Sequence, residues 1–305
     1  MRTTLSRRTV LAVPGSSERF IAKSRHLNVD AIFLDLEDAV AAGAKVAARD
    51  NVVRALRDPQ GWQAPCVTVR VNDWTGPWTV SDLIDVVGQV GDRIDAIVVP
   101  KVTGVDQIRA TDLVLSQIER GAGWPVGRIG IEAQIEDARG LIAADAIAAA
   151  SARMVSLVFG PGDFMASVGM GTLSVGSQPA GYSADAFHHA LMTILVAARA
   201  HGLQAIDGPF VGIRDLDGFV ASAAKSAALG FDGKWVVHPD QVEQGNQIYS
   251  VDPSVIERAR RIVAAYDQAT SQTGGFTGAI EVDREMVDEA GVKLAQALLA
   301  KALRQ

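Results

Sequence analysis

The segment Ile129-Gly130-Ile131-Glu132-Ala133-Gln134-Ile135-Glu136 decides the fold expected for this chain. It is an apolar stretch of strand character that closes on the carboxylate of Glu136 and then runs into a helical pattern. The segment Phe159-Gly160-Pro161-Gly162-Asp163-Phe164 has the same organisation and carries Asp163 in the turn. In a parallel α/β protein, both carboxylates would project from the same end of neighbouring strands.

Two carboxylates on rigid strand ends suit a hard divalent cation such as Mg²⁺. Such ions take a few carboxylate oxygens from the protein and leave the remaining positions to water and substrate. The competing interpretation is that each acid caps the helix that follows it. A single acid in this position is more often a cap, but the pair beside Gly160-Pro161-Gly162 favours a metal site.

Strand-like segments alternate with amphipathic helical segments along most of the chain. The expected strands are Thr9–Val13, Ala31–Leu36, Cys66–Val71, Ala96–Val102, Ile129–Ile135, Val155–Phe159, Gln204–Ile206 and Lys234–Val237, and the helices between them include Lys45–Leu56, Val105–Arg120, Ala184–His201 and Leu216–Leu229. Eight such pairs with short apolar strands predict an α/β fold, a closed (β/α)₈ TIM barrel, in preference to an open doubly wound sheet. Catalytic groups are then expected at the C-terminal ends of the strands.

The sequence after the eighth strand predicts a helical extension. Pro253–Gln268 has helical spacing, a glycine-rich turn follows at Gly274–Gly278, and a last helix is expected over Asp288–Leu303. We therefore expect a barrel domain over residues 1–250 and a C-terminal extension over residues 251–305. The apolar face of the last helix needs a partner, which predicts packing on a neighbouring subunit.

Composition limits the class of protein and its partners. With 48% apolar and 21% charged residues in 305, the chain has the composition of a soluble globular enzyme. A net charge of -6 leaves no basic face for nucleic acid or an anionic membrane, so a few local cations must hold any anionic ligand. The single cysteine, Cys66, excludes an internal disulfide and fits a cytoplasmic location. The Ser6-Arg7-Arg8 start is rejected as an export signal, because the apolar stretch behind it is too short.

Polar and charged residues also follow several of the other expected strands. Strand 2 ends in Asp35-Leu36-Glu37-Asp38. Three acids in four residues are too many for simple capping and suit the ordering of metal-bound water or of a nearby cation. Arg70 after strand 3 presents a planar fork for a carboxylate or a developing oxyanion; a salt bridge to the strand 2 acids is the other interpretation, and both can hold. His238 could act as a base or as a positioning group.

These strand ends together resemble the malyl-CoA lyase and citrate lyase β-subunit family, which comprises HpcH/HpaI aldolases of the phosphoenolpyruvate/pyruvate-binding TIM-barrel superfamily. The motifs that carry the resemblance are Leu11–Ser16, Phe33–Val40, Val69–Asn72, Val99–Lys101, Phe159–Phe164 and Gly233–Pro239, in the same order, and Ala205–Phe210 leans toward the malyl-CoA lyase branch. The resemblance implies a barrel that binds Mg²⁺, with Mn²⁺ as an alternative. It implies a lyase that cleaves or forms a carbon–carbon bond in a 3-hydroxyacyl-CoA such as malyl-CoA. Cleavage of malyl-CoA would give glyoxylate and acetyl-CoA, and the reverse reaction would join them.

The same resemblance implies roles for individual residues. It makes Glu136 and Asp163 the metal ligands and Arg70 the partner of the substrate carboxylate and oxyanion. It places Ala12, Val13, Lys23, Gly162, Val237 and His238 around the CoA thioester, with Arg70 and Asp163 also facing substrate and with Glu37, Asp38 and Lys101 supporting the metal centre. It implies that Asp288 is the general acid/base, supplied by a neighbouring subunit of a homotrimer or hexamer. The residues alone would make Asp288 a helix N-cap.

Two departures from the family leave alternatives open. In malyl-CoA lyases a cationic residue often follows the segment that corresponds to Pro14-Gly15-Ser16, but here Ser17 stands at that position, and Arg19 could supply the positive charge instead. The stretch Gly171–Ser183 is also shorter than in typical malyl-CoA lyases. The acyl-CoA and 2-oxo acid substrates are therefore not specified further. The alternatives are a malyl-CoA or citramalyl-CoA thioesterase or a citramalyl-CoA lyase on the same scaffold, and a non-catalytic CoA-binding subunit of a larger complex.

Overall fold

The structure is a computed structural model that describes residues 5–272, 275 and 278–304. The chain divides into two compact units. The first runs from Arg7 to Tyr249, and the second contains the described residues from Ser250 onward together with Leu5 and Ser6. The site residues that the sequence predicts at strand ends all belong to the first unit.

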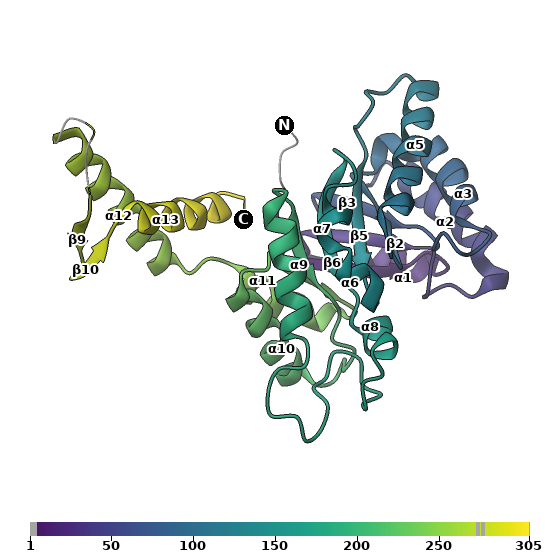
Figure 1. The fold of residues 1–305 in the computed structure, drawn as a ribbon. Coiled ribbons are helices and arrows are strands. Elements are labelled where there is room, and N and C mark those ends of the chain that lie inside the picture. The colour runs from purple at the N-terminus through teal and green to yellow at the C-terminus, as the bar shows by residue number, and fades with distance from the viewer. Residues whose placement is uncertain (1–4, 273–274, 276–277, 305) are drawn as a thin grey trace. The chain divides into compact units, whose positions relative to one another are not determined.

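The first unit is built on a closed barrel of eight parallel strands, as predicted (Figure 1). In chain order the strands are β1 (Thr9–Pro14), β2 (Ala31–Asp35), β3 (Cys66–Arg70), β4 (Ala96–Val99), β5 (Gly130–Ile135), β6 (Met154–Phe159), β7 (Gln204–Asp207) and β8 (Gly233–Val236). Each strand pairs with the next, and β8 closes the barrel by pairing with β1, with Val10 opposite Trp235. All eight C-terminal ends therefore meet at one mouth.

Helices surround the barrel on the outside (Figure 1). The longer ones are α1 (Glu18–Ser24), α2 (Lys45–Arg57), α5 (Val105–Ala122), α9 (His188–Ala200), α10 (Leu216–Leu229) and α11 (Val242–Tyr249). Short turns of helix complete the layer: η1 (Ala42–Ala44), α3 (Thr79–Asp82), η2 (Leu83–Val87), α4 (Gly88–Val90), η3 (Gly91–Arg93), α6 (Ala138–Ile142), α7 (Ala144–Ala148), α8 (Pro161–Ser167) and η4 (Pro239–Gln241). Their apolar faces and the outer faces of the strands form one hydrophobic core.

In the first unit, most boundaries lie within about two residues of the sequence prediction, and two differ by more, for local reasons. The fourth strand was expected to reach Val102 but ends at Val99, because Pro100 has no N–H for the ladder and Lys101 turns the chain with φ 50°. The helix expected from Ala184 begins at His188. The residues before it form a turn, in which the carboxylate of Asp185 accepts a hydrogen bond from the backbone N–H of Phe187 at 3.0 Å.

The two sides of β5 differ in polarity, and this alternation runs from the base of the barrel to its mouth. Glu132, Gln134 and Glu136 alternate with apolar residues of the hydrophobic core, and all are buried. At the base, Glu132 pairs with Arg7 at 2.9 Å and accepts a hydrogen bond from Ser156 at 2.7 Å. The polar side of β5 therefore faces the barrel interior, and its last member lies at the mouth.

The second unit contains α12 (Pro253–Gln272), a short antiparallel hairpin of β9 (Ile280–Val282) and β10 (Glu285–Val287), and α13 (Glu289–Ala302). Its small core is formed by Val282, Val287 and Val292 packed against the apolar side of α12. Both helices were predicted, although α12 continues to Gln272. The hairpin was missed, because strands this short show no clear alternation. The glycine-rich turn expected at Gly274–Gly278 lies mostly outside the described residues.

Within the part of the chain that the structure describes, no helix is both long enough and apolar enough to cross a membrane.

A buried ion pair ties α5 to the strands that carry the predicted site. Arg153, just before β6, holds the carboxylate of Glu119 on α5 with Nη2···Oε2 at 2.6 Å, and both side chains are almost fully buried. Glu119 also accepts hydrogen bonds from the backbone N–H groups of Gly127 and Ile129, which lead into β5. Loss of the guanidinium would leave the carboxylate buried without its counter-charge.

We expect Arg153→Met to lower the free energy of unfolding by about 3 kcal/mol or more, since methionine fills the volume but leaves Glu119 uncompensated. Arg93→Met is the matched control, because the Arg93–Asp92 pair is exposed and its loss should cost less than about 1 kcal/mol. Urea unfolding followed by circular dichroism measures both. Equal losses in the two variants would contradict this account of the buried pair.

Candidate active site

A cavity of about 370 Å³ opens at the C-terminal mouth of the barrel. Seven residues that the sequence analysis selected line it: Ala12, Asp38, Arg70, Glu136, Gly162, Asp163 and Val237. They come from the ends of β1, β2, β3, β5, β6 and β8, so the closure of the barrel brings together residues far apart in the sequence. The cavity is lined on its other sides by aromatic and apolar groups, among them Phe33, Val175 and Trp235.

Glu136 is a buried carboxylate with a fixed orientation. Its Oε1 accepts a hydrogen bond from the backbone N–H of Lys101 at 2.6 Å, and its Oε2 accepts one from the side-chain amide of Gln134 at 2.6 Å. Burial raises the pKa of Glu136 to about 8; the Lys101 hydrogen bond opposes this shift, and the nearby charge of Asp163 adds to it. A carboxyl group in this setting loses its proton readily only beside a cation, as a metal ligand does.

Neither predicted ligand caps the helix that follows it. The N-cap of α6 is Asp137, which accepts a hydrogen bond from the backbone N–H of Gly140, and the N-cap of α8 is Gly160. Asp163 lies in the first turn of α8, where its side chain is 47% exposed and open to the cavity. The capping interpretation of Glu136 and Asp163 is therefore wrong.

Arg70 combines the two interpretations that its sequence position allowed. Its Nε and Nη2 form a fork with Asp35 at 2.8 and 2.7 Å, and its Nη1 lies 3.2 Å from Glu37. Burial would lower the pKa of Arg70, but the charge and hydrogen bonds of Asp35 raise it above its usual value. The ion pair with the strand 2 acids is thus confirmed. Contact of Arg70 with a substrate stays a prediction, to which its place in the cavity wall is suited.

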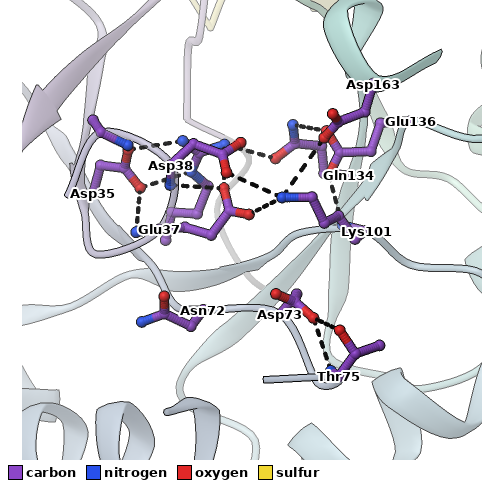
Figure 2. A network of polar contacts seen from close by, with 12 residues as sticks. Asp35, Glu37, Asp38, Asn72, Asp73, Thr75, Lys101, Gln134, Glu136 and Asp163 are labelled. Carbon is purple, nitrogen blue, oxygen red and sulfur yellow. Dashed lines mark hydrogen bonds and ion pairs between the residues drawn. The ribbon is translucent and has the colours of Figure 1, made fainter. Parts of the chain in front are cut away.

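Lys101 lies between the acids of the mouth (Figure 2). Its Nζ contacts Glu37, lies 3.1 Å from Asp38 and 3.7 Å from Asp163, while its backbone N–H points at Glu136. Burial would lower the pKa of Lys101, but the hydrogen bonds and charges of Glu37 and Asp38 raise it. The left-handed backbone at φ 50° costs roughly 1–2 kcal/mol for a residue with a side chain, so the surrounding contacts hold it there.

The structure adds detail on Asp35, one of the three acids noted after strand 2, and adds Gln134, which was not among the predicted site residues. Asp35 fixes Arg70 and also accepts hydrogen bonds from the backbone N–H groups of Glu37 and Ala39, so it shapes the turn after β2. Gln134 links Arg70 to Glu136 through its side-chain amide. The sequence did contain a signal for Gln134, because a residue two positions before Glu136 on a strand must share its side of the sheet.

Other predicted contact residues lie outside the lining of this cavity. Val13 is 1% exposed and packs in the hydrophobic core, Lys23 is exposed on α1, and His238 caps η4 through its ring nitrogen. Asp288 caps α13 by accepting a hydrogen bond from the backbone N–H of Gly291 at 3.0 Å, as its local sequence indicated. The roles of these residues in binding or catalysis stay predictions.

The donor set of the mouth fits a magnesium ion. Among the described residues, no group of three or more His, Cys, Asp or Glu side chains is arranged as a metal cluster. Glu136 and Asp163 both present carboxylate oxygens on the wall of one cavity. That is the donor chemistry of an ion that keeps several positions for water and substrate, and it is unlike a closed structural zinc site.

Residues 8–239 match the model of the HpcH/HpaI aldolase/citrate lyase family. The chain belongs to this family. An L-malyl-CoA/beta-methylmalyl-CoA lyase of Cereibacter sphaeroides is 35% identical over 95% of this chain and 92% of that protein. A (3S)-malyl-CoA thioesterase of the same organism is 34% identical over 97% of this chain and 94% of that protein.

A solved structure of this family agrees with the fold described above. The protein CitE of Mycobacterium tuberculosis, crystallised with magnesium, acetoacetate and coenzyme A, is 27% identical in sequence. It superposes with a TM-score of 0.74 over 98% of this chain and 99% of that chain. The family resemblance drawn from the strand ends is thereby confirmed.

A prediction follows from the close approach of Gly160 to Glu136. A Cβ atom at position 160 would collide with the Cβ of Glu136 and lie 2.5 Å from its Oε2. We expect Gly160→Ala to displace the carboxylate and weaken Mn²⁺ binding by about 10- to 100-fold, the loss typical of groups that orient a metal ligand. Calorimetric titration with Mn²⁺ measures this. The control is Gly121→Ala, whose added Cβ meets no atom within 4 Å; an unchanged affinity at position 160 would show that Glu136 does not hold the ion.

Proposed function

We propose that this protein is a Mg²⁺-dependent carbon–carbon lyase acting on a 3-hydroxyacyl-CoA such as malyl-CoA, with glyoxylate and acetyl-CoA on the other side of the reaction. The observation that carries the proposal is the pair Glu136 and Asp163, which share one cavity with Arg70 and are both free of capping roles. The lyase of Cereibacter sphaeroides and the magnesium, acetoacetate and coenzyme A of the CitE structure support the reaction class.

Each residue of the mouth has a part in this chemistry. Glu136 and Asp163 would hold the ion, with Mn²⁺ as an alternative to Mg²⁺. A bound divalent cation there supplies Lewis-acid polarisation of the hydroxyl and carboxylate oxygens of the substrate. Arg70, held by Asp35 in the cavity wall, would stabilise the substrate carboxylate and the charge that develops on the glyoxylate oxygen.

The carbon–carbon bond breaks as the hydroxyl oxygen releases its proton and becomes the carbonyl of glyoxylate. The enolate of acetyl-CoA that remains must then gain a proton at carbon. We assign that step to Asp288 of a neighbouring subunit, which in the condensing direction would take the same proton away. Its carboxylate is exposed at the start of α13, and its hydrogen bond to Gly291 fixes it without using both oxygens.

The CoA contacts are assigned by family resemblance to Ala12, Val13, Lys23, Gly162, Val237 and His238. Of these, Ala12, Gly162 and Val237 line the cavity and support the assignment. The other partners are a small acyl-CoA and a 2-oxo acid, in a homotrimer or hexamer. A cytoplasmic location is also part of the proposal, and it suits the free, buried thiol of Cys66, whose pKa burial raises to about 11.

Thioester hydrolysis is the second candidate, because a (3S)-malyl-CoA thioesterase is 34% identical over 97% of this chain. The two reactions share scaffold and substrate but differ in the bond that breaks. Lysis releases acetyl-CoA and glyoxylate, whereas hydrolysis releases malate and free CoA. A citramalyl-CoA lyase would release pyruvate and acetyl-CoA. A non-catalytic CoA-binding subunit is disfavoured by the presence of Glu136, Asp163, Arg70 and Asp288 together.

The products identify the reaction. We expect the purified protein with Mg²⁺ to convert malyl-CoA to acetyl-CoA and glyoxylate, and Asp163→Ala to abolish turnover while the fold stays intact, since its side chain is 47% exposed. Asp92→Ala, at 51% side-chain exposure, is the matched control and should keep full activity. Chromatography of the CoA products and a thiol assay are the measurements, with methylmalyl-CoA and citramalyl-CoA as further substrates.

Free CoA without acetyl-CoA would assign the thioesterase instead. Turnover that persists in EDTA or in Asp163→Ala would contradict the metal role. Binding of malyl-CoA without any turnover would point to the non-catalytic subunit.

A separate prediction concerns which chain supplies Asp288 to each active site. If Asp288 acts on a neighbouring subunit, then Asp288→Ala and Asp163→Ala chains are each inactive, but mixed oligomers contain some sites with both groups intact. We expect part of the activity to return when the two variants exchange subunits. Exchange is verified by mass spectrometry with one variant isotopically labelled. No recovery after confirmed exchange would show that Asp288 acts within its own chain or not at all.

A further inference from the structure

Two pairs of carboxylates face each other across the mouth of the barrel. Glu37 and Asp38 follow β2, while Glu136 and Asp163 follow β5 and β6. Lys101, from the end of β4, lies between the pairs (Figure 2). Asp38 lines the same cavity as Glu136 and Asp163, and Glu37 lies buried beside Asp38, so each pair has oxygen donors next to this cavity that could attract a divalent cation.

The ammonium of Lys101 is not shared equally between the pairs. It contacts Glu37 and lies 3.1 Å from Asp38, but it is 3.7 Å from Asp163. Glu136 receives the uncharged backbone N–H instead. One residue thus places a positive charge on the first pair and leaves the second pair short of cations.

The backbone fixes this division. The N–H of Lys101 is held by Glu136 at 2.6 Å, and its carbonyl accepts a hydrogen bond from the side chain of Gln107 at 2.9 Å. Between these two anchors the residue takes the left-handed conformation at φ 50°, which turns the side chain back from the end of β4 toward Glu37 and Asp38. An extended residue here would continue the strand and could not make both contacts.

We propose that Lys101 is a positioning residue that selects the metal site: its ammonium occupies the Glu37–Asp38 pair and so confines the divalent cation to Glu136 and Asp163. The inference rests on the proposed metal-dependent function and adds to it a reason for a single ion in a mouth rich in carboxylates. Without the ammonium, Glu37 and Asp38 become a second donor pair, because Arg70 neutralises only part of Glu37 at 3.2 Å.

The test counts Mn²⁺ bound to the substrate-free protein, by electron paramagnetic resonance of free Mn²⁺ at concentrations that saturate the wild-type site. We expect one ion per chain in the wild type, two in Lys101→Met, and one in Lys101→Arg, which restores the charge. The double variant Lys101→Met/Asp38→Asn should return to one ion, because it removes a donor from the new site. Lys225→Met, which removes a lysine paired with Asp185 elsewhere in the unit, is the matched control and should bind one.

Lys101→Gly keeps the test decisive if the methionine variant does not fold. Glycine adopts a positive φ without strain, so this variant keeps the backbone hydrogen bond to Glu136 while removing the ammonium. We expect two ions per chain in Lys101→Gly as well. A merely structural role of Lys101 would lower or preserve the number of ions bound, and would not raise it.

The outcomes separate the inference from the proposed function. One ion per chain in both Lys101→Met and Lys101→Gly would overturn the role of Lys101 and leave the metal-dependent lyase standing. A second ion that persists in the double variant with Asp38→Asn would also overturn it, since the new site would then lie elsewhere. No ion bound to the wild type would overturn the proposed metal function itself.

Discussion

The crowding of negative charge at one mouth of a parallel barrel is the constraint on which the rest of the site depends. Strand closure brings the carboxylates of Asp35 and Asp38 to the same cavity as those of Glu136 and Asp163, with Glu37 buried beside them and with Arg70 and Lys101 as the nearby cations. Such a cluster is stable only if most of its charges are compensated by fixed partners. Arg70 and Lys101 lie closest to the acids that follow β2, whereas Asp163 lies 3.7 Å from Lys101 and Glu136 receives a backbone N–H.

The rigidity of these pairings suits the chemistry. Arg70 is held by a two-pronged contact with Asp35, lies 5.4 Å from the ring centroids of Phe33 and Trp235, and reaches Glu136 through Gln134. A guanidinium fixed in this way stabilises developing charge without having to reorganise during the reaction. The same preorganisation would serve cleavage of a carbon–carbon bond or of a thioester, which explains how relatives with one scaffold carry names for both.

Much of this arrangement could be predicted from the sequence. The eight strand–helix pairs, the placement of Glu136 and Asp163 after two strands and the cap at Asp288 all depend on local patterns a few residues long. The family resemblance rested on the same strand ends, because loops after barrel strands carry the residues that define the reaction. The alternation of polar and apolar residues along β5 also predicts that Gln134 lies on the same side of the strand as Glu136. Gln134 was nevertheless not among the predicted site residues.

Only the tertiary structure decided which charges pair with which. The partner of Arg70 lies 35 residues away in the sequence, and the contacts of Lys101 with Glu37 and Asp38 span 64 and 63 residues. No local pattern encodes a choice among several acids brought to the same mouth; that choice follows from strand order, register and the left-handed turn at Lys101. The sequence by itself determined the fold and the kinds of groups at the mouth, because periodicity and turn chemistry are local. The pairing of these acids with Lys101 and Arg70 depends on distances that exist only after the barrel closes.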